Sequence, residues 1–546
     1  MRLANSKTKS ETGFDHVIQN ISVGTPFGRK ALKEIEPFMP GQEHQLREEL
    51  AKVAVLLSAV SEQPGKIEIL DEIFMEVKDI TQTVGRSAGN ALSVVELFEV
   101  KNFLIQMKRI SDIETALIQY IPKELILADT TAILDILDPR KDRINTFYIY
   151  DEFSEKLASY RKEKRELELE IRKYQKELRQ QIEKTYGVSL TPRFEILISK
   201  ANADMLEKVR AIPELEFDSE DYMTATYALR SNEAIFAVKR KMEDLNVLIE
   251  DEELSVREKL SREIARCGDT LLRNGLRIGE LDLILAKAKY AGAHRCVEPE
   301  ILSDHRVSIE DGRHIVVEEI LESKGKAFKP VSITLEDGVT CITGANMGGK
   351  TVSLKLAGLV ALLAQHGFFV PCASAGIGLS SYIHILIGDT QSMQRGLSSF
   401  GGEMEELKDI LDQSRDNALI LIDEIANGTN PVEGLALTKS IIGYLDRRKY
   451  ITVITTHFDN VAVGDRVRSM QVRGLAGADM EKLVRELRYA NRRERIEVIA
   501  KYMDYRLYPV GGGEEIPKDA LNIAKMLGIY DEIIDHAKQI LIKGGN

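Results

Sequence analysis

The segment GANMGGKT at residues 344–351 has the residue types and the spacing to bind phosphate. It satisfies the pattern G-x-x-x-x-G-K-[ST], with the strand-like VTCIT directly before it and the helix-like VSLKLAGLVALLA directly after it. Glycines let backbone N–H groups close around phosphate oxygens, and the start of a helix adds a favourable dipole. A glycine-rich turn without a ligand is the simpler alternative, but it would not require these flanking elements. The residues expected to contact a nucleotide are Gly344, Asn346, Gly348, Gly349, Lys350 and Thr351.

A second segment, LILIDE at residues 419–424, is an apolar strand that ends in two carboxylates. In a parallel sheet, such a strand delivers both acids to the edge where bound phosphates would lie. Asp423 would then hold Mg²⁺ together with Thr351, and Lys350 would reach the β and γ phosphates. Glu424 would orient and deprotonate the attacking water. A strand capped by two solvated acids is the alternative, and the nearby phosphate-binding segment favours catalysis over it.

Alternating strand-like and helix-like segments position these groups. After Gly292, the strands VTCITG, ALILID and YITVITT are each followed by a helical stretch. This alternation predicts a mostly parallel sheet covered on both faces, which is an α/β nucleotide-binding domain over residues 292–546. The third strand leads into Thr455-Thr456-His457, so His457 could sense a γ phosphate. A lone histidine at a strand end is usually structural, however, and the spacing alone does not decide between the two roles.

The sequence before residue 292 has a different, mainly helical pattern. Apolar residues at three- and four-residue spacing predict a helical domain over residues 1–150. A charged stretch without internal Gly or Pro then predicts one long helix up to Gly187, and helical periodicity returns at Phe236. The strand-like segments FEILIS and TATYAL lie between these helices. We therefore expect an arm over residues 151–291 with a small mixed module, residues 187–235, at its tip.

The composition limits the class of protein. The 546 residues are 44% hydrophobic and 29% charged, and 74 Lys and Arg against 86 Asp and Glu give a formal net charge of −12. This charge excludes a globally basic nucleic-acid binder but leaves a local basic groove open. The 4 cysteines lie far apart, which argues against a disulfide framework and favours a cytoplasmic location. The sequence contains neither a recognisable signal peptide nor an apolar stretch long enough to span a membrane.

Several motifs together resemble the ATPase domain of the MutS family, in the same order and with matching spacing. They are GANMGGKT, IGDTQS at 387–392, SSFGGEM at 398–404, LILIDEIANGTNPVEG at 419–434 and TTHF at 455–458. The family's lever domain opens with residues that resemble Thr25, Gly28, Arg29 and Leu32. The segment GRHI (312–315) resembles the family's entry to the ATPase domain. The resemblance implies an α-helical lever arm with a small mixed clamp module, joined to an α/β ABC-type P-loop ATPase domain with a C-terminal helix-turn-helix.

The resemblance also implies an enzyme that uses ATP and Mg²⁺ and in which two subunits face each other. Ser398 and Ser399 would contact the γ phosphate of the partner's nucleotide. Gln391 would lie near Mg²⁺ and the water, and His457 would be the switch histidine. Phe328 matches the aromatic residue that lies against adenine. A homodimer is the expected assembly, with the C-terminal segments DALNIAKML and DEIIDHAKQIL forming a helical hairpin that clasps the neighbouring subunit.

Three departures from the family pattern concern what the protein acts on. The lever-like sequence begins almost at the N-terminus, which leaves no room for mismatch-reading and connector domains. Residues 187–235 contain five basic and nine acidic residues, a balance of −4, whereas a clamp that holds DNA by its phosphates should be locally basic. An additional charged, helix-like stretch at about 477–501 precedes YRLYPV.

Two functions follow from these observations. The first is a MutS-like ATPase whose ATP binding and hydrolysis open and close a helical clamp on DNA, in repair or recombination and without mismatch recognition. The second is an ATP-dependent reactivating chaperone for a protein client such as an adenosylcobalamin-dependent aminomutase, with which short proteins of this build are associated. The acidic tip favours the protein client, and the family resemblance favours DNA. A scaffold that binds ATP without turnover is a third interpretation, which Asp423 and Glu424 disfavour.

Overall fold

The computed structural model describes residues 2–344, 349–388, 399–426, 428–458, 461–475, 477–489, 491, 494–510 and 519–543. Four residues expected at the nucleotide lie outside the described ones, namely Asn346, Gly348, Gln391 and Ser398. Ser399 enters only as the first backbone position of helix α15 (Ser399–Gln413). The chain folds into two compact units, one of residues 1–76, 113–126 and 277–546 and the other of residues 77–112 and 127–276. The three-part division at residues 150 and 291 stays a prediction.

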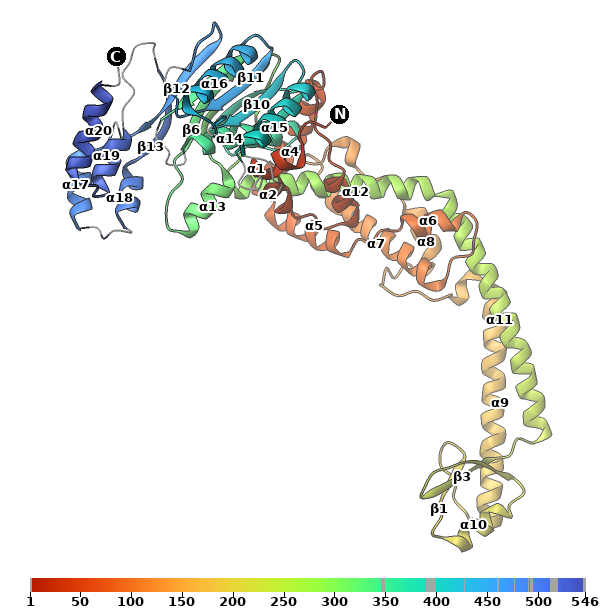
Figure 1. The fold of residues 1–546 in the computed structure, drawn as a ribbon. Coiled ribbons are helices and arrows are strands. Elements are labelled where there is room, and N and C mark those ends of the chain that lie inside the picture. The colour runs from red at the N-terminus through yellow and green to blue at the C-terminus, as the bar shows by residue number, and fades with distance from the viewer. Residues whose placement is uncertain are drawn as a thin grey trace. The chain divides into compact units, whose positions relative to one another are not determined.

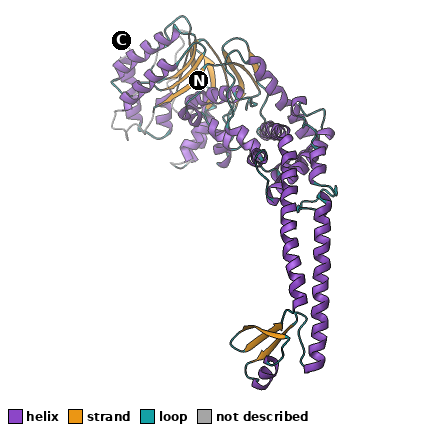
Figure 2. Ribbon diagram, turned by 90° about the vertical axis from the view of Figure 1, so that its right-hand side faces the viewer, coloured by secondary structure: helices purple, strands orange, loops and turns teal. Residues whose placement is uncertain are grey.

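Two long helices dominate the unit of residues 77–112 and 127–276 (Figures 1 and 2). Helix α9 (Glu155–Tyr186) begins where the Ser154 hydroxyl accepts a hydrogen bond from the Leu157 N–H, and it ends at Gly187, whose φ is 60°. Helix α11 (Glu233–Arg266) is capped by the Asn232 side chain and packs alongside α9. Other helices with residues in this unit are α6 (Thr81–Ser87), α7 (Val94–Ala116), α8 (Thr131–Leu137), η2 (Asp151–Phe153) and α12 (Gly268–Ala293).

A small mixed module lies between α9 and α11 in the chain. Strands β1 (Glu195–Ser199), β2 (Leu215–Glu220) and β3 (Thr224–Leu229) form an antiparallel sheet in the order β1-β3-β2, and α10 (Ala203–Arg210) packs against β1 and β2. The strands predicted in FEILIS and TATYAL are confirmed. Strand β2 was not predicted, because every residue after Leu215 is exposed and the strand lacks an alternating apolar pattern.

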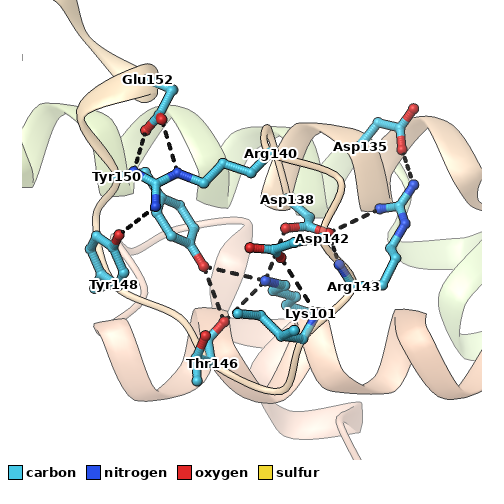
Figure 3. A network of polar contacts seen from close by, with 11 residues as sticks. Lys101, Asp135, Asp138, Arg140, Asp142, Arg143, Thr146, Tyr148, Tyr150 and Glu152 are labelled. Carbon is cyan, nitrogen blue, oxygen red and sulfur yellow. Dashed lines mark hydrogen bonds and ion pairs between the residues drawn. The ribbon is translucent and has the colours of Figure 1, made fainter.

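A buried ion pair anchors the segment that leads into α9 (Figure 3). Lys101 on α7 and Asp138 after α8 are 1% and 0% exposed, and Lys101 Nζ lies 3.1 Å from Asp138 Oδ1. The same ammonium donates to the Thr146 carbonyl at 3.0 Å and to the Tyr150 hydroxyl at 3.3 Å. Because residues 138–150 contain neither helix nor strand, these contacts are what hold them against α7.

The other unit is built on a sheet with the strand order β13-β12-β7-β11-β10-β9. Strands β7 (Gly338–Thr343), β10 (Ala418–Asp423) and β11 (Tyr450–Thr455) are buried at every position. Such continuously buried strands are expected when both faces of a parallel sheet are covered. Strand β9 (Tyr382–Ile387) is parallel to β10, strand β12 (Val467–Gly474) is parallel to β7, and β13 (Asp504–Pro509) pairs antiparallel with β12 at the edge. The mixed α/β class predicted for this region is confirmed.

Helix α14 (Gly349–Gln365) is the central helix of this unit. Most of its residues are buried, and it contacts β9, β10 and β11 as well as β5 (Arg306–Gly312). Strand β5 belongs to a second sheet of order β4-β8-β5-β6, with β4 (Glu300–Leu302), β6 (Val331–Glu336) and β8 (Ser374–Gly378). This second sheet was not predicted, although β6 alternates between buried and exposed residues as a half-buried strand does.

The remaining helices of this unit precede, separate or follow its strands in the chain. They are α1 (Ser6–Glu11), α2 (Phe14–Gln19), α3 (Pro26–Lys33), α4 (Glu43–Glu62), α5 (Pro64–Glu76), η1 (Lys123–Leu125), α13 (Ile315–Ser323), α16 (Pro431–Asp446), α17 (Met480–Tyr489), α18 (Glu494–Tyr502), α19 (Asp519–Met526) and α20 (Asp531–Lys543). The expected C-terminal hairpin corresponds to α19 and α20, and the additional charged stretch to α17 and α18. The lever, clamp and helix-turn-helix arrangement remains a prediction. No described helix has both the length and the hydropathy to cross a membrane.

Candidate nucleotide-binding site

The expected phosphate-binding segment connects β7 to α14, and both of its described ends require glycine. Gly344 follows β7 with a φ of 119°, in the left-handed region that favours glycine. Gly349 begins α14, where an added Cβ would lie 2.9 Å from the ring of Tyr505. The strand, the glycines and the helix therefore occur in the order that the sequence predicted.

Lys350 lies in the first turn of α14 and is 3% exposed. Its Nζ is 3.5 Å from Glu424 Oε1, 3.3 Å from His457 Nδ1 and 3.5 Å from the Thr456 carbonyl oxygen. Burial lowers the pKa of Lys350, and the negative charges of Glu424 and Asp423 oppose that lowering. The ammonium therefore occupies an enclosed position at the carboxyl ends of β10 and β11, beside α14.

Asp423 is the last residue of β10 and is held from two sides. Its Oδ2 accepts a hydrogen bond from the Thr351 hydroxyl at 2.8 Å, and its other carboxylate oxygen accepts one from the Thr455 hydroxyl. Asp423 and Thr455 are paired in register across β10 and β11, so the two strand ends meet here. Carboxylate and hydroxyl oxygens are donors that Mg²⁺ prefers. Among the described residues, no group of three or more His, Cys, Asp or Glu could hold a metal ion on its own.

Glu424 has a left-handed backbone, with a φ of 53°, which is uncommon for a residue with a side chain. Its N–H donates to the Thr455 carbonyl and to the Thr455 hydroxyl, each at 3.1 Å. Its carboxylate contacts Lys350 and pairs with the imidazole of His457. The turn after β10 therefore directs the carboxylate back toward α14, and backbone geometry of this kind is often found at functional sites.

Glu403 on α15 is a residue that the sequence interpretation missed. Its Oε2 accepts a hydrogen bond at 3.2 Å from the N–H of Ala426, two residues after Glu424. Burial raises the pKa of Glu403, while the Ala426 hydrogen bond opposes the increase. Glu403 is the glutamate of SSFGGEM, but no local pattern in that segment indicates its contact with residue 426.

A cavity of about 570 Å³ begins at Gly349 and contains Phe328, the residue expected to lie against adenine. Its volume is within the usual range for small-molecule sites. The lining residues are Val317, Leu321, Gly325, Lys326, Ala327, Phe328, Lys329, Val331, Gly349, Val352, Glu497, Lys501 and Tyr505. The last three come from α18 and β13, which the sequence did not connect to the nucleotide.

Two lysines hold the segment around Phe328 against α18. Lys326 Nζ lies 3.4 Å from Glu497 Oε1, and Lys329 Nζ donates to the carbonyls of Lys501 and Met503, at the end of α18. Carbonyl groups at a helix C-terminus lack intrahelical partners and attract cations. The additional stretch at 477–501 therefore contributes one wall of the cavity.

The structure brings together most of the described residues predicted for the site. Gly344, Gly349, Lys350, Thr351, Asp423, Glu424 and His457 gather at the carboxyl ends of β7, β10 and β11, and Phe328 lines the adjoining cavity. The buried ammonium of Lys350 can bind the phosphates of a nucleotide. The oxygens of Thr351 and Asp423 can bind its metal ion. The carboxylate of Glu424 can activate a water molecule beside the nucleotide.

Comparison with known proteins supports the same assignment. Residues 340–543 match MutS domain V. The chain is 26% identical to the DNA mismatch repair protein MutS of Aquifex pyrophilus over 507 residues, which cover 90% of this chain and 56% of that relative. It is 27% identical to endonuclease MutS2 of Shouchella clausii over 536 residues, covering 94% of this chain and 62% of the relative. Endonuclease MutS2 of Acetivibrio thermocellus is 32% identical over 312 residues, covering 56% and 36% of the two chains.

The chain is therefore similar to the MutS family, in domain V at residues 340–543 and to MutS and MutS2 proteins over most of its length. The chain spans 56% of the length of the MutS relative and 62% of the length of the first MutS2 relative. Domain V covers the main sheet, α14 and the residues that follow them, which include the described site residues from Lys350 to His457.

Proposed function

We propose that this chain is an ATPase that hydrolyses ATP at the carboxyl ends of β7, β10 and β11. The observation that carries the proposal is the convergence of Lys350, Thr351, Asp423 and Glu424 from two distant segments. In the reaction, the water oxygen attacks the γ phosphorus, the bond to the β–γ bridging oxygen breaks, and ADP and phosphate leave. Phosphoryl transfer depends mainly on positioning and charge neutralisation, and these residues can supply both.

Lys350 contacts Glu424 from the first turn of α14, directly after the expected phosphate-binding segment. Burial lowers the pKa of its ammonium and nearby negative charge opposes this, so β and γ phosphates would help to keep it charged. The lysine would then be shared between the phosphates and Glu424, whose carboxylate accepts the proton from the attacking water. His457 contacts both Lys350 and Glu424, which is the position that a residue sensing the γ phosphate needs.

Thr351 and Asp423 would hold Mg²⁺, which neutralises charge on the phosphates when it is bound. The 2.8 Å contact between their side chains brings two hard oxygen donors to one point. Phe328 would lie against the adenine in the cavity beside Gly349, with α18 as the opposite wall. Gly344, Asn346, Gly348 and Gly349 would supply backbone contacts to the phosphates.

We further propose that the enzyme acts as a homodimer in which each subunit completes the site of the other. Ser398 and Ser399 would contact the γ phosphate bound by the partner, and Gln391 would lie near Mg²⁺ and the water. The C-terminal hairpin supports the assembly, because α19, α20 and their connection expose several apolar side chains. These are Leu527, Ile529, Tyr530, Ile533 and Ile540.

The proposed client is DNA in a repair or recombination setting, without mismatch recognition, and the clamp is the arm of α9 and α11 with its small module. The relatives support this client through their names, which describe a DNA mismatch repair protein and endonucleases. ATP binding and hydrolysis would open and close the arm.

One observation favours a protein client as a second candidate. Strand β2 at the tip exposes Glu216, Asp218 and Glu220, and the neighbouring side chains of Phe217 and Tyr222 are 55% and 94% exposed. Exposed aromatic residues among carboxylates suit a basic protein surface better than a phosphate backbone.

Steady-state ATP hydrolysis by the full chain tests the proposed activity. Lys350→Ala should abolish turnover, because the phosphates lose their buried cation. The control is Lys439→Ala, which removes the same charge from an exposed position on α16 and should leave turnover unchanged. Turnover by Lys350→Ala at the wild-type rate would contradict the proposal.

A further inference from the structure

The N-terminal helix α1 contacts both helices that extend from the proposed site. At its end, Glu11 Oε2 accepts a hydrogen bond from Lys355 on α14 at 2.8 Å. Near its start, Lys7 Nζ lies 2.9 Å and 2.8 Å from the two carboxylate oxygens of Glu406 on α15. Helix α14 begins at the phosphate-binding segment, and α15 begins at Ser399. A helix of only 6 residues therefore joins the two elements that carry opposite halves of the expected ATP sites.

Close packing fixes α1 in this position. The Leu3 carbonyl accepts a hydrogen bond from the Ile383 N–H at 2.7 Å, so the segment before α1 lies against the edge strand β9. Thr12, directly after α1, is fully buried, and a Cβ at Gly358 of α14 would lie 2.7 Å from its methyl group. Glycine at position 358 is thus what lets the N-terminal segment approach the helix so closely. This terminus is part of the core rather than a frayed end.

Glu406 connects α1 to the catalytic turn through α15. Burial alone would raise the pKa of Glu406, but hydrogen bonds from His384 and Lys7 outweigh it, and the pKa is lowered. The carboxylate is therefore held in its charged form. Glu403 lies one helical turn before Glu406 and accepts the hydrogen bond from the Ala426 N–H, next to Glu424. The position of α15 is thereby linked both to α1 and to the turn that carries the proposed base.

We infer that α1 is a strut that sets α15 relative to α14, and that Lys7 and Glu406 are positioning residues for ATP hydrolysis. The inference rests on the proposed function, because α14 would bind the subunit's own nucleotide while α15 would complete the partner's site. Displacing α15 should disturb the geometry of hydrolysis more than the binding of ATP. A shift of about 1 Å in a positioning element can lower a rate by about a hundredfold.

Charge reversal of the pair is the direct test. Lys7→Glu and Glu406→Lys should each lower kcat by about ten- to a hundredfold, with the dissociation constant for ATP changed less than about threefold. The double variant Lys7→Glu, Glu406→Lys restores an ion pair of opposite direction and should recover most of the lost kcat. If circular dichroism and thermal melting of the double variant are native-like but its kcat stays low, the inference that α1 is a strut is wrong.

A matched control uses an exposed ion pair on the same helix. Lys408 and Asp412 are 73% and 62% exposed, and they pair at one-turn spacing on α15. Asp412→Lys makes the same charge change on α15 as Glu406→Lys, and Lys408→Glu makes the same change as Lys7→Glu, so each single variant should leave kcat unchanged. An equal loss of kcat in this control would mean that helix charge, and not the strut, affects the rate.

Heterodimers separate failure of the strut from failure of the proposed function. If Lys350→Ala is inactive while Lys7→Glu and Glu406→Lys hydrolyse ATP at the wild-type rate, the proposed ATPase activity is supported. The inference that α1 is a strut is then wrong. In a heterodimer of Glu406→Lys with Lys350→Ala, the remaining competent nucleotide site belongs to the Glu406→Lys subunit and receives an intact α15 from its partner. Its turnover per competent site should therefore exceed that of the Glu406→Lys homodimer, in which both the partner's α15 and the Glu403 contact with residue 426 are disturbed. A rate equal to that of the Glu406→Lys homodimer would place the whole effect in the subunit's own site and overturn the contribution of α15 to the partner's site.

Discussion

The hydroxyl of Thr351 lies 2.8 Å from Oδ2 of Asp423, although 72 residues separate them in the chain. The contact joins the first turn of α14 to the carboxyl end of β10. Because each residue is held by a buried element, the pair defines one point at which a metal ion and a phosphate would be bound. The predictions about nucleotide chemistry start from this point.

Glu424→Gln should still bind Mg·ATP and lose most turnover, by about a hundredfold or more, because a carboxamide does not accept the proton of the water. Asp423 remains to hold the metal. Steady-state hydrolysis and binding of a fluorescent ATP analogue measure the two properties separately. Glu433→Gln, at an exposed position in the first turn of α16, is the control and should behave as the wild type does. If Glu424→Gln hydrolyses ATP at a rate within a few-fold of the wild type, Glu424 is not the general base.

Phe328→Ala should weaken ATP binding by about five- to a hundredfold, because stacking of a base on an aromatic ring contributes about 1–3 kcal/mol. The turnover of bound ATP should change much less, since the base lies away from the reacting phosphate. Titration with fluorescent nucleotides measures the affinity. Phe236→Ala is the control, because Phe236 is 62% exposed on α11. Unchanged affinity in Phe328→Ala would mean that the cavity beside Gly349 does not hold the base.

Removing four negative charges from the tip should raise the affinity for duplex DNA and make the salt dependence of binding steeper. The variant replaces four acidic residues with Gln, namely Glu214, Glu216, Asp218 and Glu220. Wild-type affinity at physiological salt should stay in the weak nonspecific range of about 10⁻⁴ to 10⁻⁶ M. Salt titration of binding to duplex and branched DNA, with and without ATP, checks both expectations. The control removes four exposed carboxylates from α9 instead, at Glu163, Glu166, Glu168 and Glu170. Nanomolar wild-type binding that is lost on deletion of the tip would establish the DNA clamp and refute the acidic-tip argument.

Lys101→Met should destabilise the unit of residues 77–112 and 127–276 by about 3 kcal/mol, because it removes the buried cation of Asp138 and leaves only the partly exposed Arg143 beside it. Replacing both residues with apolar ones should cost less than the single change. Denaturant unfolding measures the difference. Lys108→Met is the matched control on α7, since Lys108 and Asp112 form an exposed pair, and it should cost less than about 1 kcal/mol. Equal effects of Lys101→Met and Lys108→Met would contradict the anchoring role of the buried pair.

Stability should fall as the pH drops below 6.5, in part through two buried histidines. Burial lowers the pKa of His314 and of His366 to about 4. Between the unfolded value of about 6.5 and the folded value, the unfolded chain binds protons that the folded chain does not, so stability is present above pH 6.5 and lost below it. Each histidine should contribute about 2 kcal/mol of loss between pH 6.5 and 5.

Unfolding at several pH values checks this slope. In His314→Gln the free energy of unfolding should fall less steeply between pH 6.5 and 5 than in the wild type, whatever the variant's stability at pH 7. His44→Gln, at a side chain that is 82% exposed, should leave the slope unchanged. A slope unaltered by His314→Gln would mean that this histidine takes up its proton equally in both states.

The sequence by itself determined the central strands and the presence of the phosphate-binding pattern. Strands β7, β10 and β11 were predictable because each is a continuous apolar run bounded by helical sequence, and that local pattern is typical of a covered parallel sheet. The same alternation places Asp423 and the glycines at one sheet edge. Helices α9 and α11 were predictable because a long charged stretch without Gly or Pro has no competing local structure.

Only the tertiary structure decided which distant segments complete the candidate site. The contact of Glu403 with Ala426, the position of α18 beside Phe328 and the ion pair of Lys7 with Glu406 join segments far apart in the sequence. The exposed strand β2 was missed because it lacks a clear local period, whereas the second sheet was missed although β6 alternates between buried and exposed positions. Periodicity reports which face of an element is buried, but it carries no information about what that face packs against. Those partners depend on the shape and charge of side chains that meet after the chain has folded.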